Sequence, residues 1–303
     1  MFHARFLLAL FILHFWTIGQ TLATTKCTSY SSHWLEKTVS FCIERTRPEL
    51  DHENEPVIYF LHGLGGNQTT WSKGGYSEAL SELTSKDPNF PALTFVSFET
   101  EMDSFFSDFE GRPEGSKAYE SWFLNDFIPF IEEKYDVCKT QNCRGVAGVS
   151  MGGFGALKFA LKFQHLFSLG AANSPALPPF SIHESNEEWK DYFSNTKIGV
   201  TKGMLLLRDV RKIFPTEELY QLNNPNALVE NSQNSQQFPK LYFDVGSEDN
   251  FGFQVGYQIF KETLDLAEKN YSAAIEEGGD HFIYHHRNRN LIEFIKEWAV
   301  EIK

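Results

Sequence analysis

One serine in the chain stands in a setting that could make it a nucleophile. Ser150 lies between Gly148 and Gly152 in the segment RGVAGVSMGGFGALKFAL, with an apolar run before it and a helical pattern after it. A G-x-S-x-G turn between a strand and a helix exposes the serine oxygen, and the helix N-terminus favours developing negative charge. The alternative is an ordinary strand-to-helix turn, in which small residues are common. A base and an acid elsewhere in the chain would decide between the two.

A serine hydroxyl becomes a nucleophile only when a base takes its proton. Where the serine stands on such a turn, the acid follows it in the chain and the histidine comes last. His281 directly follows the glycine turn that ends the predicted strand YSAAIEEGG, and it precedes the terminal helix. His285 and His286 are its rivals. We expect His281 to be the base.

Three carboxylates compete to be the acid that orients this histidine. Asp244 lies within the predicted strand KLYFDVG, so we expect its side chain to point across the sheet and to hold neighbouring backbone N–H groups. Glu248 and Asp249 both lie in the loop beyond that strand, where such an acid is found. Because consecutive loop residues seldom face the same way, only one of them should reach His281.

Acyl transfer also needs hydrogen-bond donors for the oxyanion. The segment YFLHGLGGNQTTW supplies a strand and then a glycine-rich turn from His62 to Gly66. We expect the backbone N–H groups of Leu64 and Met151 to converge on one point, where each donor stabilises a transition state by about 3–4 kcal/mol. The alternatives are an ordinary loop and a phosphate-binding loop. The second is excluded, because the lysine and the serine or threonine that should follow it are missing.

Strands and helices alternate in a pattern typical of a doubly wound α/β fold. Near-continuous apolar runs, typical of parallel strands buried on both faces, occur at residues 56–62, 92–98, 144–150, 167–174 and 240–246. Helical patterns separate or follow them at residues 77–85, 118–135, 152–164, 256–270 and 290–302. The alternation predicts a mostly parallel sheet with helices on both faces. Ser181 to Asn226 breaks the rhythm, and we expect a short helical insertion over the carboxyl edge of the sheet.

Four segments together resemble the esterase D family of α/β-hydrolases: FLHGLGGNQTTW, GVSMGGFGAL, DVGSEDNF and GGDHFIYH. That family includes S-formylglutathione hydrolases, feruloyl and acetylxylan esterases, tributyrin-type esterases and mycolyltransferases. The resemblance runs from about Val57 to the C-terminus. It implies an α/β-hydrolase fold, and it selects Asp249 as the acid by the G-x-x-D spacing from Gly246. The other implied roles are the nucleophile Ser150, the base His281, and the oxyanion donors Leu64 and Met151.

A further segment, DSFFSDFEG, resembles the family's SFYSDW segment near the acyl pocket. It departs from the family pattern at Phe106 and Phe109, where tyrosine and tryptophan are frequent. The resemblance implies substrate contacts from Phe105, Phe106 and Phe109. Trp189 and Phe193 in the insertion extend the expectation of an aromatic pocket.

The N-terminus predicts export. Arg5, an apolar run and small residues up to Ala23 follow the order of a secretory signal peptide, with cleavage after Ala23. A membrane anchor is the alternative, but the run is shorter than the roughly 18 residues of a span, and His14 interrupts it. We expect residues 24–303 to form a single esterase domain, secreted or periplasmic, without stable membrane insertion.

All four cysteines lie beyond this segment, and an even count in an exported chain indicates disulfide bonds. Three pairings are possible. We favour the two local ones, Cys27 with Cys42 across an early hairpin-like region and Cys138 with Cys143 in CKTQNC. Free buried thiols are the alternative.

Charge and spacing exclude other classes of protein. The chain carries a net charge of −13, and the residues after Ala23 hold 26 basic against 40 acidic side chains, a net charge of −14. Nucleic acids and anionic membranes are therefore not expected partners. There is no CxxC and no histidine pair beside a cysteine pair, so we expect no zinc site, no other metal and no cofactor. The oligomeric state is not indicated.

We therefore expect a secreted serine carboxylesterase that forms an acyl-enzyme on Ser150 and hydrolyses short-chain or aryl esters, free or linked to polysaccharide. One alternative is an acyltransferase of the mycolyltransferase type, in which a second alcohol replaces water. Another is a catalytically dead binding protein on a hydrolase scaffold. A glutathione thioesterase fits less well, because those relatives work in the cytosol.

Overall fold

The computed structural model describes most of the chain after the predicted signal peptide, namely residues 25–49, 54–108, 118–232, 237–282 and 285–302. The predicted signal peptide and Phe109 lie outside these ranges. Within them, no helix is both long and apolar enough to cross a bilayer.

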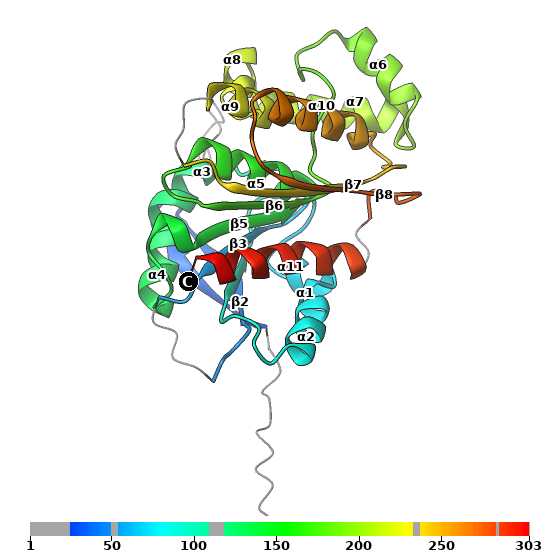
Figure 1. The fold of residues 1–303 in the computed structure, drawn as a ribbon. Helices are drawn as coiled ribbons and strands as arrows, with labels where there is room; N and C mark the ends of the chain where they lie inside the picture. The colour runs from blue at the N-terminus through cyan, green and yellow to red at the C-terminus, as the bar shows by residue number, and fades with distance from the viewer. Residues whose placement is uncertain (1–24, 50–53, 109–117, 233–236, 283–284, 303) are drawn as a thin grey trace, which may run out of the picture.

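A mostly parallel sheet of eight strands forms the centre of the described part, in the order β1-β2-β4-β3-β5-β6-β7-β8 (Figure 1). Only the β1–β2 and β2–β4 pairs are antiparallel. The strands are β1 (Lys26–Ser32), β2 (Lys37–Arg45), β3 (Val57–Leu61), β4 (Thr94–Phe98), β5 (Arg144–Val149), β6 (Leu169–Asn173), β7 (Lys240–Gly246) and β8 (Ser272–Glu276).

Hydrophobicity explains which strands lie in the middle. VIYFL of β3 and TFVSF of β4 are buried at every position, as expected of strands covered on both faces. The edge strand β8 is half-exposed. The prediction of a mostly parallel α/β sheet, with an α/β-hydrolase fold, is confirmed.

Helices cover both faces of the sheet, and a separate apolar core lies between the helices and each face (Figure 1). One face carries α1 (Thr70–Lys73), α2 (Tyr76–Lys86) and α11 (His285–Glu301). The other carries α3 (Tyr119–Trp122), a π-helical turn (Phe123–Phe127), α4 (Ile128–Tyr135), α5 (Met151–Lys162) and α10 (Phe253–Leu266).

The expected insertion consists of four helices between β6 and β7: α6 (Asn186–Ser194), α7 (Gly199–Ile213), α8 (Glu217–Gln221) and α9 (Pro225–Asn231). Side chains cap three of them: the Ser185 hydroxyl accepts from the Glu188 N–H, the Thr216 hydroxyl from the Leu219 N–H, and the Asn224 amide oxygen from the Asn226 N–H. Helices α6 and α7 pack closely, because a Cβ at Gly203 would collide with the ring of Phe193. The insertion therefore forms a packed layer of helices, whose Trp189, Phe193 and Leu207 share an apolar core with α5.

Both disulfide bonds have the local pairing that the sequence favoured. Cys27 and Cys42 lie directly opposite each other in the β1–β2 ladder and are joined. Cys138 and Cys143 close a short loop before β5.

The two disulfide bonds should stabilise the fold unequally, because loop-closure entropy grows with loop length. The sequence separations are 15 and 5 residues. Replacing Cys27 and Cys42 by serine should lower the free energy of unfolding by about 3 kcal/mol, and the Cys138/Cys143 double substitution by about 2 kcal/mol. Urea denaturation of the two variants measures the difference. An equal loss, or a larger loss from the short loop, would contradict the expectation.

Candidate active site

Ser150 stands on a strained turn between β5 and α5. Its backbone angles are φ 56° and ψ −118°, outside the helical and strand regions. The backbone is crowded here, since a Cβ on Gly152 would collide with the carbonyl of Leu61 and one on Gly148 with the backbone of Gly152. Only glycine fits these two positions. The Ser150 N–H donates to the carbonyl of Asn173 at 3.0 Å, which ties the turn to β6.

Ser150, His281 and Asp249 form a linear hydrogen-bonded array. The Ser150 Oγ lies 2.9 Å from His281 Nε2, and His281 Nδ1 lies 2.7 Å from Asp249 Oδ2. The second carboxylate oxygen of Asp249 accepts the N–H of Phe251 at 2.8 Å. With its Oδ2 occupied by His281, the buried Asp249 fixes the proton on Nδ1 and leaves Nε2 to accept a proton from the serine.

The loops that carry the acid and the histidine are joined to each other. The Glu248 N–H donates to the carbonyl of Gly279 at 2.8 Å, and the Ser247 N–H donates to that of Glu276 at 2.9 Å. A Cβ at Gly246 would collide with the Gly279 carbonyl, so glycine is required where the loops cross. The phenyl rings of the β7–α10 loop then flank His281, with Phe251 4.5 Å from it between ring centres. Backbone contacts therefore set the distance between acid and base.

The rival residues have other partners. Asp244 is buried in β7, where it binds Arg287 of α11 through both oxygens at 2.6 and 3.2 Å and accepts the Ser174 N–H at 3.1 Å. Glu248 is exposed and pairs with Lys197. His285 pairs with Glu82 at 2.6 Å, and His286 pairs with Glu276 at 2.7 Å.

The predicted oxyanion donors flank the nucleophile. Neither the Leu64 N–H nor the Met151 N–H has a hydrogen-bond partner among the residues that the structure describes, and both residues line the pocket at Ser150. The β3–α1 turn is held around them by the Gly65 N–H, which donates to Met102 at 3.0 Å.

His62 supports this turn through hydrogen bonds, a role that was not predicted from the sequence. It is 1% exposed, and burial lowers the pKa of its imidazole, so the ring is neutral. Its Nε2 accepts the Thr100 N–H at 3.2 Å, which leaves the proton on Nδ1 to bond the Gly63 carbonyl at 2.8 Å. A strand-end histidine before a glycine turn was the available signal.

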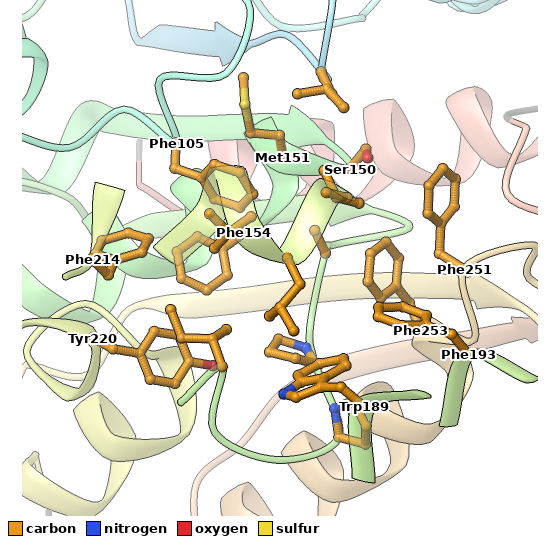
Figure 2. Close-up of a pocket in the computed structure, with 18 of the residues that line it drawn as sticks. Phe105, Ser150, Met151, Phe154, Trp189, Phe193, Phe214, Tyr220, Phe251 and Phe253 are labelled. Atoms are coloured by element: carbon orange, nitrogen blue, oxygen red, sulfur yellow. The ribbon is translucent and has the colours of Figure 1, made fainter. Parts of the chain in front are cut away.

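A cleft of about 790 Å³, including its open mouth, extends from Ser150 between α5 and the insertion (Figure 2). Phe105, Trp189 and Phe193 line it, as the sequence analysis expected. Phe106 does not, because its ring is buried in the core against His62 and Phe98. The sequence analysis did not single out several other lining residues, namely Phe154, Ile182, Leu207, Val210, Phe214, Tyr220, Phe251 and Phe253.

A buried lysine fixes the segment that carries Phe105. Phe105 and Phe106 have positive φ angles of 45° and 51°, which non-glycine residues rarely adopt. Lys158 of α5 is fully buried, and its Nζ donates to the Phe106 carbonyl at 2.7 Å and to the Ser107 hydroxyl at 2.8 Å. Glu120 neutralises it at 2.9 Å. The helix that follows Ser150 therefore holds one wall of the cleft directly.

Comparisons with known proteins find similarity to esterases. A family model described as "Putative esterase" matches residues 46–298. An acetyl esterase of Caldicellulosiruptor saccharolyticus is 26% identical over 209 residues, 68% of this chain and 70% of that protein. An esterase of Mycobacterium tuberculosis is 31% identical over 124 residues, which cover 40% of this chain and only 25% of that protein. An S-formylglutathione hydrolase structure from Agrobacterium tumefaciens has a TM-score of 0.69 at 18% identity, covering 93% of this chain and 96% of that one.

The three nearby carboxylates should respond differently to neutral substitution. Asp249→Asn should lower turnover by about 10⁴, because the amide stabilises the wrong histidine tautomer. Glu248→Gln should turn over nearly normally, since its carboxylate is exposed and faces Lys197. Asp244→Asn should lower the free energy of unfolding by about 3 kcal/mol, because it breaks a buried ion pair. Steady-state kinetics and urea denaturation of all three separate the roles. Normal turnover by folded Asp249→Asn would refute the assignment.

Lys158→Met should destabilise the wall of the cleft. The substitution leaves the Phe106 carbonyl and Glu120 without their buried partner, so we expect a loss of about 3 kcal/mol in unfolding free energy and a raised KM. Lys162→Met is the matched control, because Lys162 also pairs with Glu120 but its side chain is 25% exposed, and it should cost about 1 kcal/mol. Equal effects of the two substitutions on KM would contradict this role.

Proposed function

The chain belongs to this esterase family and is a serine carboxylesterase, and on that premise we propose that Ser150, His281 and Asp249 are its catalytic triad. The observation that carries the proposal is the array of two short hydrogen bonds, 2.9 Å from serine to histidine and 2.7 Å from histidine to aspartate. It has the order of roles that an activated serine requires.

In the acylation step, His281 Nε2 takes the proton of the Ser150 hydroxyl as Oγ attacks the ester carbonyl carbon. The new C–O bond converts the carbonyl oxygen to an oxyanion, and the N–H groups of Leu64 and Met151 donate to it. Asp249 stabilises the imidazolium that has formed. The tetrahedral intermediate then expels the alcohol, which takes the proton from His281, and the acyl group stays on Ser150.

In the deacylation step, water takes the place of the alcohol, and the same protein groups act again. His281 takes a proton from water, the hydroxide attacks the acyl carbon, and Ser150 leaves with the proton as the carboxylic acid is released. The membership in an esterase family favours water over a second alcohol as the acceptor. We therefore place hydrolysis ahead of acyl transfer.

We further propose that the enzyme works outside the reducing cytosol. Support comes from the N-terminal pattern of residues 1–23 and from the two disulfide bonds of the folded part. The cleft suits an apolar acyl group, because aromatic and aliphatic side chains make up nearly all of its lining.

Ser150→Ala should lower the rate of ester hydrolysis by several orders of magnitude. It should leave the fold intact, because a methyl group fits the turn. The measurement is hydrolysis of 4-nitrophenyl esters, with circular dichroism to confirm folding. A fluorophosphonate probe should label the wild-type enzyme and fail to label the variant. Hydrolysis by the folded variant at the wild-type rate would overturn the nucleophile assignment.

A further inference from the structure

One polar side-chain atom in the cleft has no partner. Almost all lining side chains are hydrocarbon, and the polar exceptions are Ser150, Trp189, Tyr192 and Tyr220. The Trp189 indole N–H donates to the Ser181 carbonyl at 3.1 Å, and the Tyr192 hydroxyl donates to the Phe251 carbonyl at 3.3 Å. Ser150 is paired with His281. Within the part of the chain that the structure describes, the Tyr220 hydroxyl alone among these groups lacks a hydrogen bond.

Tyr220 is held firmly in this position. It belongs to α8, its side chain is 2% exposed, and its ring packs edge-on against Phe214 with 6.0 Å between ring centres. Figure 2 shows Tyr220 at the end of the cleft opposite Ser150, with its oxygen turned inward. Burial raises the pKa of this phenol, so the hydroxyl keeps its proton and is a neutral donor.

The hydroxyl of Tyr220 faces the cleft and is free to hydrogen-bond a ligand there. The neighbouring walls of the cleft supply no partner for it, because Phe154, Phe214 and Val210 offer no polar side-chain atom. A ligand that places an oxygen at this end would form a hydrogen bond with Tyr220. A purely hydrocarbon ligand would bury the hydroxyl without one, which is unfavourable.

The lining of the cleft favours the acyl group over the alcohol as its occupant. His281 must protonate the departing alcohol, so the alcohol lies beside His281. The imidazole of His281 is not among the described residues that line the cleft, although the rings of Phe251 and Phe253 that flank it are. Ser150 and both candidate oxyanion donors, Leu64 and Met151, do line it. The cleft therefore suits the group that remains on Ser150 after the alcohol leaves.

We propose that the enzyme selects acyl groups with a hydrocarbon body and one uncharged oxygen, a hydroxyl, carbonyl or ether, at the far end, where Tyr220 binds it. This specificity rests on the proposed function, because it needs Ser150 to be the acyl acceptor. A terminal carboxylate or ammonium is excluded, because none of the described residues that line the cleft carries a charge to compensate it.

The test compares matched pairs of 4-nitrophenyl esters across a length series of straight acyl chains. The two members of each pair have the same length, and one ends in a methyl group and the other in a hydroxyl group. At the length that reaches Tyr220, the wild-type enzyme should prefer the hydroxyl-ended ester by about tenfold in kcat/KM. Tyr220→Phe, which removes only the oxygen atom, should bring this ratio to one or below.

Tyr192→Phe is the matched control. It removes a hydroxyl from the same cleft, but one that is already bonded to Phe251, so the preference for the hydroxyl-ended ester should persist. The proposal is overturned if the wild-type ratio never exceeds one at any length, as expected if Tyr220 binds only water. It is also overturned if Tyr220→Phe keeps the wild-type ratio.

A binding measurement separates this proposal from the proposed function. Calorimetry on Ser150→Ala protein with alkanamides and their hydroxyl-ended counterparts reads the selectivity without catalysis. Tighter binding of the hydroxyl-ended amide than of the plain amide, with this difference in affinity lost in the double variant Ser150→Ala/Tyr220→Phe, supports the subsite. This holds even if no ester is hydrolysed. Failure of the wild-type protein to react with a fluorophosphonate refutes the proposed function alone. Equal binding of both amides refutes the subsite alone.

Discussion

The backbone of α5 passes so close to the end of β3 that a side chain at Gly152 would overlap the Leu61 carbonyl. This contact forces the chain to turn sharply between β5 and α5, and Ser150 takes the strained conformation that turns its hydroxyl outward. The same closeness sets the start of α5 beside the glycine turn that follows β3, and in the described part of the chain neither the Met151 N–H nor the Leu64 N–H has a hydrogen-bond partner. The candidate nucleophile and its donors thus follow from one steric constraint.

A second, buried constraint keeps the candidate acid and base in line. Arg287 binds both oxygens of Asp244 and donates to the Ser174 hydroxyl at 2.7 Å, which ties α11 to β7 and to the end of β6. Asn173 also donates to Asp244 at 2.7 Å and accepts from Tyr76 at 3.0 Å. Breaking a pair of this kind is costly, because it leaves an uncompensated charge in the core. The ends of β6 and β7 are therefore held to the start of α11.

Sequence patterns predicted the sheet, the flanking helices and the residues around Ser150, because each depends on local features such as apolar runs and glycine turns. The side-chain environments were harder to predict. Phe105 and Phe106 are adjacent and chemically identical, yet one lines the cleft and the other enters the core, since two positive φ angles rotate the segment. Lys158 resembles a surface lysine in the sequence, and its burial is explained by partners distant in the chain, namely the Phe106 carbonyl, the Ser107 hydroxyl and Glu120. Tyr220 gave no local signal, because its position depends on how the insertion folds over the sheet.

The candidate catalytic groups and one wall of the cleft come from different parts of the chain. Ser150, Asp249 and His281 stand on loops at the ends of sheet strands, whereas Trp189, Leu207 and Tyr220 belong to the helical layer between β6 and β7. Changes in this layer can therefore alter which esters are bound and leave Ser150, Asp249 and His281 in place. For protein engineering, residues 181–231 form a segment that can be exchanged, because it lies between β6 and β7 in the chain.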